Sequence, residues 1–417
     1  MKKLGKYSMG LGDRFGRQAP AQLKAVIDAG KKGIEITPVW NKSNREHLII
    51  GTAPGDVRAE ADAAVKALKF RKPYFVDADH INFDTVGRFT DASDFFTIDV
   101  AAYIGQKAGD EDIKAFVKKA EKLKGKLRIQ GIPKPFNITS LYLKKVAEKY
   151  LFATKMAGVI YRRIENLKGK GNFVTEISMD EVPEPQTPSE LYFILFMLAI
   201  EKIPVQTIAP KFQGRFNKGV DYVGKPELFA LEFESDLLVI KQAVKKFSLP
   251  ENLKISVHSG SDKFALYPHI GRIIRKHDAG IHLKTAGTTW LEEVTGLAMA
   301  GGESLAFVKE IYKNAFEKAD ELCAPYADVI DIKKERLPSP STVMKWNSRE
   351  FSSAISHNSD CRDYNPDMRQ LIHVGYKLAA LRMDEYLALI DRNRDIVAKC
   401  VYENIYDRHI CRIFGIK

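Results

Sequence analysis

Three of the nine histidines stand beside polar and charged residues at points where short apolar runs end. His80 follows Asp77 and Asp79 in VDADH, His258 opens HSGSDK, and His282 stands in GIHLK. Neutral imidazole is the commonest protein ligand for a divalent transition metal. A catalytic metal keeps about three protein ligands and leaves room for substrate or water. We therefore predict a metal site with His80, His258 and His282 as ligands, against the simpler interpretation that each histidine only packs.

Carboxylates at similar positions could move protons beside such a metal. Asp77 and Asp79 share one face of a strand, because side chains alternate with a period of two. Glu176 stands among apolar residues in FVTEIS. A carboxylate in such surroundings is costly to bury unless it is paired, metal-bound or protonated. Asp180 follows on the same segment and fits either a site residue or a solvated loop.

The charge of the chain is strongly positive, with a formal net charge of +12. The lysines are scattered, without the clustered basic patch of a nucleic-acid surface, so we predict no nucleic-acid partner. A positive field would instead help to collect an anionic small molecule. Lys263 and Lys284 follow two of the histidines. They fit either a grip on a substrate carboxylate or ordinary surface lysines.

The elements that must position these residues alternate between short β-rich runs and amphipathic helical stretches. This order predicts a parallel sheet, and about eight strands indicate a closed (β/α)8 TIM-type barrel, although counting does not exclude an open, doubly wound sheet. Catalytic residues of such barrels stand at the carboxyl ends of strands, where these histidines and carboxylates fall. The predicted strands are 6–10, 33–37, 74–78, 95–99, 173–178, 205–209, 254–258 and 279–283.

The chain divides into three regions by composition. We predict a catalytic barrel over 1–300, a long lysine-rich helical insertion within it at 107–171, and a helical C-terminal extension over 301–417 packed on the barrel. The apolar run at 191–200 is shorter than the ~18 residues of a membrane span, and the basic start MKKLGK has no apolar h-region behind it. Four widely spaced cysteines fit a reducing compartment. We therefore expect a cytoplasmic protein without a membrane partner.

Several longer segments resemble the tagaturonate/fructuronate epimerase family. They are VDADHI (76–81), TEISMDE (175–181), SVHSGSDKF (256–264), HLKTAGTTWLEEV (282–294) and RQLIHV (369–374), which follow the family's order and span most of the chain. SMGLGDRFG (8–16), which contains Arg14, is similar to the start of the family's catalytic region. The resemblance implies an isomerase that interconverts D-tagaturonate and D-fructuronate in hexuronate breakdown with a divalent metal.

The resemblance also implies roles for matching positions. Asp79 is implied as proton acceptor, Glu176 as proton donor, and His80, His258 and His282 as metal ligands. Separately from the resemblance, we predict that Arg14, Lys263, Lys284 and Asp180 bind the substrate. The metal would be zinc, manganese, cobalt, nickel or iron, since imidazole and carboxylate suit all of them. Arg215 departs from the family, in which an acidic residue is typical there. A neutral or phosphorylated ketose 4-epimerase therefore stays an alternative.

The implied chemistry fits these residue types. The two sugars differ at the carbon β to the ketone, whose hydrogen is not acidified by simple enolisation. We predict a retro-aldol route, in which a base takes the hydroxyl proton, the metal stabilises the enolate as a Lewis acid, and the aldehyde turns before re-addition. Direct deprotonation and transient oxidation remain alternatives. Rival functions are a metal-dependent aldolase that releases the fragments and, from another class, a non-catalytic sugar-binding protein.

Overall fold

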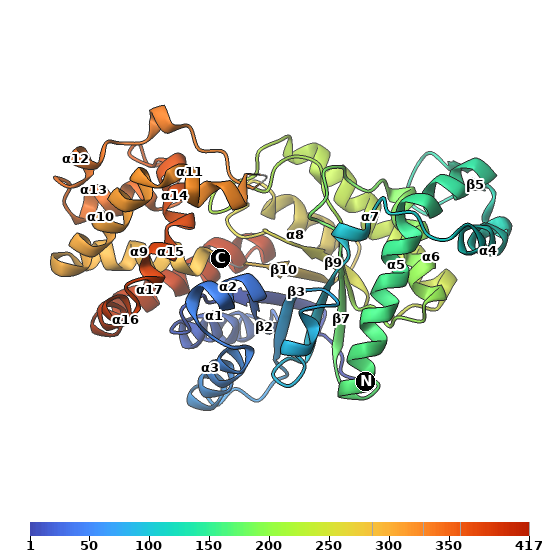
Figure 1. Ribbon diagram of the computed structural model, residues 1–417, viewed down its shortest axis with the longest axis horizontal. Coiled ribbons are helices and arrows are strands. Elements are labelled where there is room, and N and C mark those ends of the chain that lie inside the picture. Colours follow the sequence, from blue (N-terminus) through green and yellow to red (C-terminus); the bar gives the residue numbers. More distant parts are fainter. Residues whose placement is uncertain (286, 328, 359, 417) are drawn as a thin grey trace.

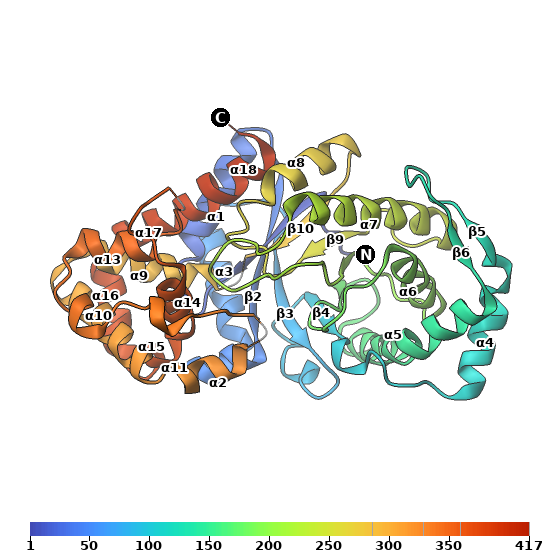
Figure 2. The ribbon, with the colours of Figure 1, turned by 90° about the horizontal axis from the view of Figure 1, so that it is seen from above.

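Parallel strands close into a barrel in the computed structural model, which describes residues 1–285, 287–327, 329–358 and 360–416 (Figures 1 and 2). The order around the barrel is β1-β10-β9-β8-β7-β4-β3-β2, so neighbours in space follow the chain. The strands are β1 (Tyr7–Gly12), β2 (Ile36–Ser43), β3 (Phe75–Ile81), β4 (Phe95–Asp99), β7 (Val174–Ser178), β8 (Thr207–Ala209), β9 (Lys254–Val257) and β10 (Ile281–Lys284). The predicted (β/α)8 barrel is confirmed.

Each predicted strand overlaps an observed one, and the largest difference is in β2. The sequence predicts a strand over 33–37, whereas β2 continues to Ser43 and pairs Asn41 with Asp77 and Ser43 with Asp79 of β3. The end of β2 is polar, which is typical of a loop in sequence. Polar residues are tolerated there because Asn41 and Ser43 line a cavity at the end of the barrel.

An outer layer of helices covers the barrel, and its apolar faces join the strands in one hydrophobic core. Helix α6 begins as the sequence predicts, with a capping box in which Thr187 accepts from the Glu190 backbone and the Glu190 carboxylate accepts from the Thr187 backbone. These helices are α1 (Ala19–Lys31), α3 (Pro54–Ala67), α5 (Ser140–Lys168), α6 (Pro188–Ile200), α7 (Pro226–Phe247) and α8 (Tyr267–Lys276).

The segment 107–171, which is predicted as an insertion, lies between β4 and β7, on the right of Figure 1, and its helix α5 is also one of the helices that cover the barrel. It contains α4 (Asp110–Ala120), the long helix α5 and a small antiparallel hairpin of β5 (Gly125–Leu127) and β6 (Phe136–Ile138). The sequence does not predict this hairpin, because strands of only three residues carry too little alternation to be recognised.

Helices after β10 build a second hydrophobic core on the left of Figure 1. Besides Phe15 and Ile50, this core contains residues of α9 from Trp290 onward, before the boundary near residue 300 that the composition predicts. We propose that these helices form a unit of their own. They are α9 (Thr288–Ala300), α10 (Gly302–Glu317), α11 (Ala319–Cys323), α12 (Pro340–Val343), α13 (Ser348–Ile355), α14 (Pro366–Val374), α15 (Tyr376–Ala380), α16 (Met383–Arg392) and α17 (Arg394–Glu403).

The end of the described chain returns to the barrel. A π-helical segment, η6 (Asn404–Ile410), and the short helix α18 (Cys411–Phe414) contact α1 and α8. Helix α2 (Asn44–Ile50), which follows β2, contacts α15 of the helical extension. No helix in the described ranges combines the length and the apolar character that crossing a bilayer requires.

One buried carboxyl in the outer layer makes stability depend on pH. Asp236 of α7 is 1% exposed, and neither of its oxygens has a hydrogen-bond partner among the described residues. Burial, together with the charge of Glu232, raises the pKa of Asp236 well above the ordinary 3.8. The folded protein therefore keeps a proton that the unfolded chain releases, and the free energy of unfolding falls as pH rises from the unfolded toward the folded pKa.

We expect Asp236→Asn to flatten this part of the pH dependence, because the amide carries no proton to release. Urea unfolding between about pH 5 and pH 9 measures the slope. Asp91→Asn, at an exposed carboxyl, is the matched control and should keep the wild-type slope. An Asp236→Asn protein with the same slope as the wild type would show that Asp236 is ionised in the folded state.

Candidate metal and proton-transfer site

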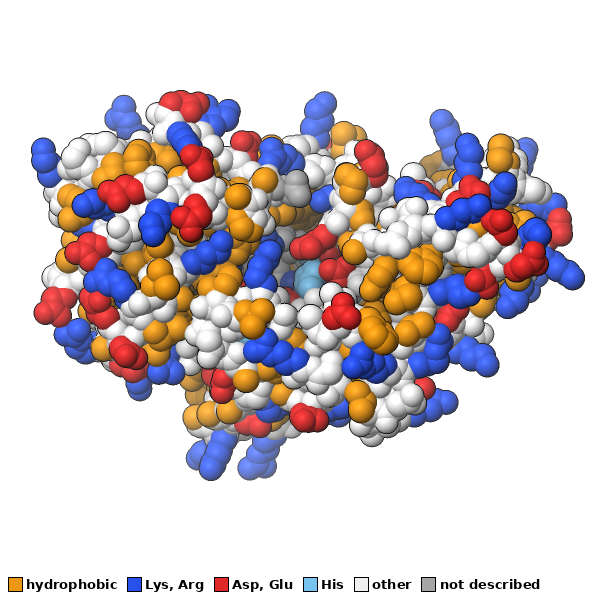
Figure 3. Space-filling view, in the orientation of Figure 1, with side chains coloured by type: hydrophobic (Ala, Val, Ile, Leu, Met, Phe, Trp, Pro, Cys, Tyr) orange, Lys and Arg blue, Asp and Glu red, His pale blue; other side chains and the backbone are white. Residues whose placement is uncertain are grey.

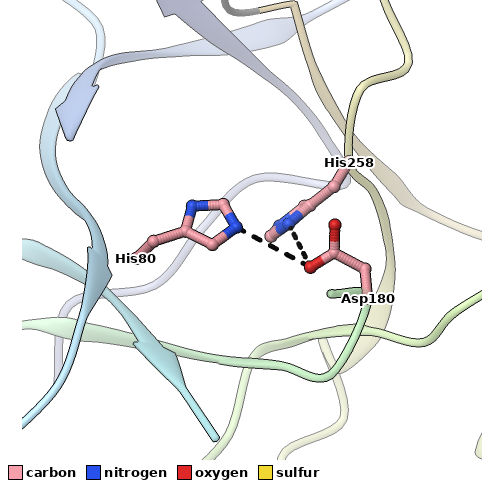
Figure 4. Close-up of side chains that lie close together, drawn as sticks. All are labelled: His80, Asp180 and His258. Atoms are coloured by element: carbon pink, nitrogen blue, oxygen red, sulfur yellow. Dashed lines mark hydrogen bonds and ion pairs between the residues drawn. The ribbon is translucent and has the colours of Figure 1, made fainter. Parts of the chain in front are cut away.

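Two histidines and an aspartate converge at the carboxyl ends of the barrel strands (Figure 4). His80 is the second-last residue of strand β3, Asp180 follows β7, and His258 follows β9 directly. One oxygen of Asp180 lies 3.0 Å from His258 Nδ1 and 3.7 Å from His80 Nε2. The two imidazole centroids are 4.9 Å apart. One potential ligand atom from each of the three residues lies within 4.8 Å of the others, so the group can hold a metal ion.

The donor set fits a divalent transition metal. Two imidazoles and one carboxylate make a three-ligand set that leaves positions for substrate or water. His80 Nε2 is buried and has no hydrogen-bond partner among the described residues. A buried polar atom without a partner is destabilising, and a cation would satisfy this nitrogen. The same donors suit zinc, manganese, cobalt, nickel and iron.

Local backbone geometry turns these side chains toward the cavity. His80 has a φ of 51° and Ser259 a φ of 48°, both in the left-handed region that non-glycine residues rarely adopt. The pairing of β3 with β4 also shifts register between Ala78 and Ile81. Such conformations cost about 1–3 kcal/mol each and occur most often at functional sites. The irregular backbone at the end of β3 therefore helps to orient His80 toward the cavity.

A buried ion network lies next to the histidines, with Lys284 of β10 at its centre. Lys284 Nζ lies 2.8 Å from Asp77 Oδ2, 2.6 Å from Asp79 Oδ1 and 3.1 Å from Glu176 Oε1. The same Glu176 oxygen lies 2.7 Å from His258 Nε2. Glu176 therefore links the network to the candidate metal ligands.

This network sets the protonation states. Burial alone would lower the pKa of Lys284, but the neighbouring carboxylates Asp77, Asp79 and Glu176 raise it well above 10.5. Burial alone would raise the pKa of Asp79 and Glu176, but Lys284, with His80 and His258 respectively, lowers both well below their ordinary values. Both carboxylates are thus ionised at neutral pH.

A glycine makes room for the lysine at the centre of the network. A Cβ atom on Gly10 of β1 would lie 2.9 Å from Lys284 Cγ and 3.2 Å from its Cα. A side chain at position 10 would therefore push Lys284 away from its carboxylates.

Two adjoining cavities open beside these groups. The first, called here the inner cavity, has a volume of about 310 Å³ and is lined by Asp79, His80 and Lys284, among others. The second, the outer cavity, has a volume of about 500 Å³, and both cavities share Asp180 and His258. Figure 3 shows the hollow near the middle of this face, with a histidine inside it and acidic and basic side chains around it. A substrate in the inner cavity would lie against Asp79, His80 and His258, which line it.

The structure brings together four residues that the sequence predicts for catalysis and metal binding: Asp79, Glu176, His80 and His258. His282 lies apart from the metal group. Its ring is fully buried, its Nδ1 lies 2.9 Å from Ser8 Oγ, and it packs beside Phe95. Burial lowers the pKa of His282 to about 3. The third member of the group is Asp180, which is predicted from the sequence to bind the substrate instead.

The predicted substrate-binding cations have different places. Lys263 is 1% exposed, and its ammonium donates to the carbonyls of Asn217, Val220 and Ser261 at 2.9, 2.7 and 2.9 Å. The structure therefore uses Lys263 inside the protein and does not place it on either cavity. Arg14 does line the inner cavity.

Arg14 and Arg215 are both held by protein partners. Arg14 Nε donates to Glu46 Oε1 at 2.9 Å, and its guanidinium lies 3.9 Å from the centre of the Tyr376 ring. Arg215 lines the outer cavity, and its guanidinium lies 3.5 Å from Asp331 Oδ2.

The helical extension contributes to the site through a buried arginine. Arg369 of α14 is 0% exposed, and its Nη2 donates to Asp262 Oδ2 at 2.6 Å and to Glu292 Oε1 at 3.2 Å. Its Nε donates to the Gly219 carbonyl at 2.6 Å. Asp262 follows His258 on the same loop, so Arg369 holds the loop that carries a candidate ligand.

The π-helical segment η6 holds the same loop from another side. Asn404 Nδ2 donates to Asp262 Oδ1 at 3.2 Å, and the Asp262 backbone N–H donates to His409 Nε2 at 3.1 Å. Asp262 has a φ of 58°, which these contacts stabilise. The loop after β9 is therefore fixed by two segments far away in sequence.

Comparisons with known proteins agree with one another. A family model described as tagaturonate epimerase, UxaE, matches residues 1–410. The tagaturonate/fructuronate epimerase of Thermotoga maritima is 27% identical over 426 residues, which cover 98% of this chain and 81% of that protein. The fructuronate-tagaturonate epimerase UxaE of Cohnella laeviribosi, crystallised with two glycerols, has a TM-score of 0.82 at 24% identity, covering 100% of this chain and 83% of its own. Its complex with one glycerol has a TM-score of 0.81 at 24% identity, covering 99% and 81%. At that identity the structural likeness shows the fold.

Proposed function

This chain belongs to the tagaturonate epimerase family and is an isomerase, and we propose that it interconverts D-tagaturonate and D-fructuronate with a divalent metal. The observation that carries the proposal is the position of the His80, Asp180 and His258 group. It lies beside the ionised carboxylates Asp79 and Glu176, at the end of the barrel where such folds place their active sites.

We propose His80, Asp180 and His258 as the metal ligands. A divalent cation held there would act as a Lewis acid toward a carbonyl or enolate oxygen of the substrate. Glu176 orients His258 through its contact with Nε2, and Asp79 lies 2.9 Å from His80 Nδ1, so each histidine is held by a carboxylate. Such supporting carboxylates fix the orientation of ligating imidazoles.

Asp79 is positioned to start the reaction as a base. In the proposed route it takes the proton of the hydroxyl on the carbon that inverts. The bond from this carbon to the carbon next to the ketone then breaks, and its electron pair stays on the ketone-bearing fragment as an enolate. The other fragment becomes an aldehyde that carries the carboxylate. Rotation of the aldehyde and re-addition reform the bond with the opposite configuration.

Glu176 and Lys284 complete the proton transfers. After rotation the new hydroxyl oxygen points in another direction, so a second group must supply its proton. Glu176 is ionised, but Lys284 contacts both Asp79, at 2.6 Å, and Glu176, at 3.1 Å. Lys284 can therefore pass a proton between the two carboxylates, and Glu176 can deliver it. No net proton is gained or lost in the cycle.

Metal-stripped protein should form little fructuronate from tagaturonate. Addition of the divalent metal that the site uses, tested among zinc, manganese, cobalt, nickel and iron, should restore turnover. The same assay run in heavy water should give product without deuterium at the inverted carbon, because the proposed route never breaks its C–H bond. Product formation and deuterium content are measured by chromatography and mass spectrometry.

Asp180→Asn should weaken both metal binding and turnover, whereas Asp99→Asn, at another carboxylate lining the inner cavity, should keep metal binding. Deuterium at the inverted carbon would contradict the retro-aldol route. Absence of turnover despite bound metal would contradict the uronate substrate and direct the search to neutral or phosphorylated ketoses. Accumulation of three-carbon fragments instead of the epimer would favour an aldolase.

A further inference from the structure

The proposed substrate carries a carboxylate, yet the cations expected to bind it are engaged within the protein. Lys284 contacts buried carboxylates, Lys263 donates to three carbonyls, and Arg14 is paired with Glu46 and stacked on Tyr376. Each of these cations therefore already has carboxylate or carbonyl partners within the protein before a substrate binds. An anionic ligand needs a different cation to balance its charge on leaving water.

Two other cations line both cavities. Lys218 lies in the segment between β8 and α7, and Arg45 lies in the first turn of α2. Within the ranges that the structure describes, neither makes an ion pair with a carboxylate. We infer that Lys218 and Arg45 form the binding site for the carboxylate of the substrate, an inference that rests on the proposed function.

The Lys218 ammonium is placed next to the candidate metal ligands. Its Nζ donates to Ser259 Oγ at 2.8 Å, and Ser259 directly follows His258. An ammonium has three donor hydrogens, so this contact leaves others for a ligand. The Lys218 backbone N–H donates to the Val329 carbonyl at 2.8 Å, and the Arg369 side chain holds the carbonyl of the next residue, Gly219. The backbone that carries Lys218 is therefore fixed at both of these peptide groups.

Arg45 adds a second positive charge from the barrel side. Its guanidinium lies over the Tyr326 ring, 4.9 Å from the ring centre, which positions it while leaving its planar donor edge available. Tyr326 belongs to the helical extension and lines both cavities with the two cations. The site would thus be formed between the barrel and the extension.

The location also suits the proposed reaction. Bond cleavage produces an aldehyde fragment that carries the carboxylate and must turn without leaving. Lysine is a compact charge on a flexible stem, so Lys218 can keep its contact with a carboxylate while the rest of the fragment rotates. Retention of this fragment would separate an epimerase from an aldolase.

The test compares Lys218→Gln and Arg45→Gln with Lys211→Gln. Lys211 lines only the outer cavity, so its variant controls for the loss of one positive charge. We expect Lys218→Gln to lower kcat/KM for tagaturonate by about 10- to 100-fold, chiefly through KM, because a charged hydrogen bond to the ligand is lost. Binding of D-galactonate, measured by calorimetry, should weaken by a similar factor. Binding of the neutral galactitol should not change.

The two proposals fail in distinguishable ways. If tagaturonate is not turned over but D-galactonate binds more tightly than galactitol, and Lys218→Gln removes that difference, the carboxylate site stands and the proposed reaction falls. If tagaturonate is turned over and Lys218→Gln and Arg45→Gln both behave like Lys211→Gln, the carboxylate site is overturned and the reaction stands. Equal binding of the two probes by the wild-type protein would also overturn the carboxylate site.

Discussion

Replacement of Glu176 by glutamine is expected to lower kcat for tagaturonate epimerisation by about 10²- to 10⁴-fold, the range typical of a lost proton-transfer group. Glutamine has the shape of glutamate but cannot accept a proton. One Glu176 oxygen contacts His258 and Lys284, while the other is buried and has no hydrogen-bond partner among the described residues.

Steady-state kinetics and metal analysis of the same preparation separate two explanations for a low rate. If Glu176 transfers a proton, Glu176→Gln should bind metal and lose kcat. If Glu176 only orients His258, the variant should lose metal, and excess metal should restore the rate. Glu181→Gln is the matched control, because Glu181 lines both cavities without contacting the Lys284 network. It should lose far less activity, and a wild-type kcat in Glu176→Gln would contradict the proposed role.

Replacement of Arg369 by methionine should destabilise the protein by about 3–5 kcal/mol, as expected when one partner of a buried ion pair is removed. The variant leaves Asp262 and Glu292 buried without their arginine. It also frees the Gly219 carbonyl and the loop that carries His258. We therefore expect a lower melting temperature, weaker metal binding and a higher KM in the molecules that remain folded.

Arg382→Met provides the control for the loss of an arginine from the extension. Arg382 pairs with Glu310 and Glu385 on the surface, where such pairs contribute about 0–1 kcal/mol. A second variant, Arg369→Met with Asp262→Asn, removes the unpaired charge and should recover part of the stability. Equal melting temperatures for Arg369→Met and Arg382→Met would show that Arg369 does not stabilise the loops that carry Gly219 and Asp262.

The barrel, and the site residues that stand at the ends of its strands, can be predicted from local patterns in the sequence. Alternating apolar runs and helical stretches are sufficient to predict the strands. His80, Glu176 and His258 are recognisable because strand ends of a barrel face one cavity. Asp77 could also have been selected for the site, since it shares a strand face with Asp79, and both contact Lys284.

The remaining site residues depend on contacts that no local pattern describes. Like His258, His282 stands near the end of a predicted strand. In the structure, however, His282 lies within β10 and pairs with Ser256 of β9, whereas His258 lies beyond the carboxyl end of β9. Lys218 and Arg45 carry no signal, because a loop and a helix far apart in sequence bring them to the same cavities. Sequence spacing also cannot show that Lys263 is consumed by backbone carbonyls.

Closure of the barrel has a consequence for how the protein is made. Tyr7 of β1 pairs with Ile281 of β10, and Arg369 pairs with Asp262, which is 107 residues earlier in the chain. Contacts between such distant residues form slowly, because long loops must close first. At ribosomal rates of about 5–20 residues per second, Arg369 is synthesised roughly 5–20 seconds after the loop that carries His258 and Asp262. A nascent chain would thus expose apolar strands before it has a working site, and we expect it to need chaperone protection during synthesis.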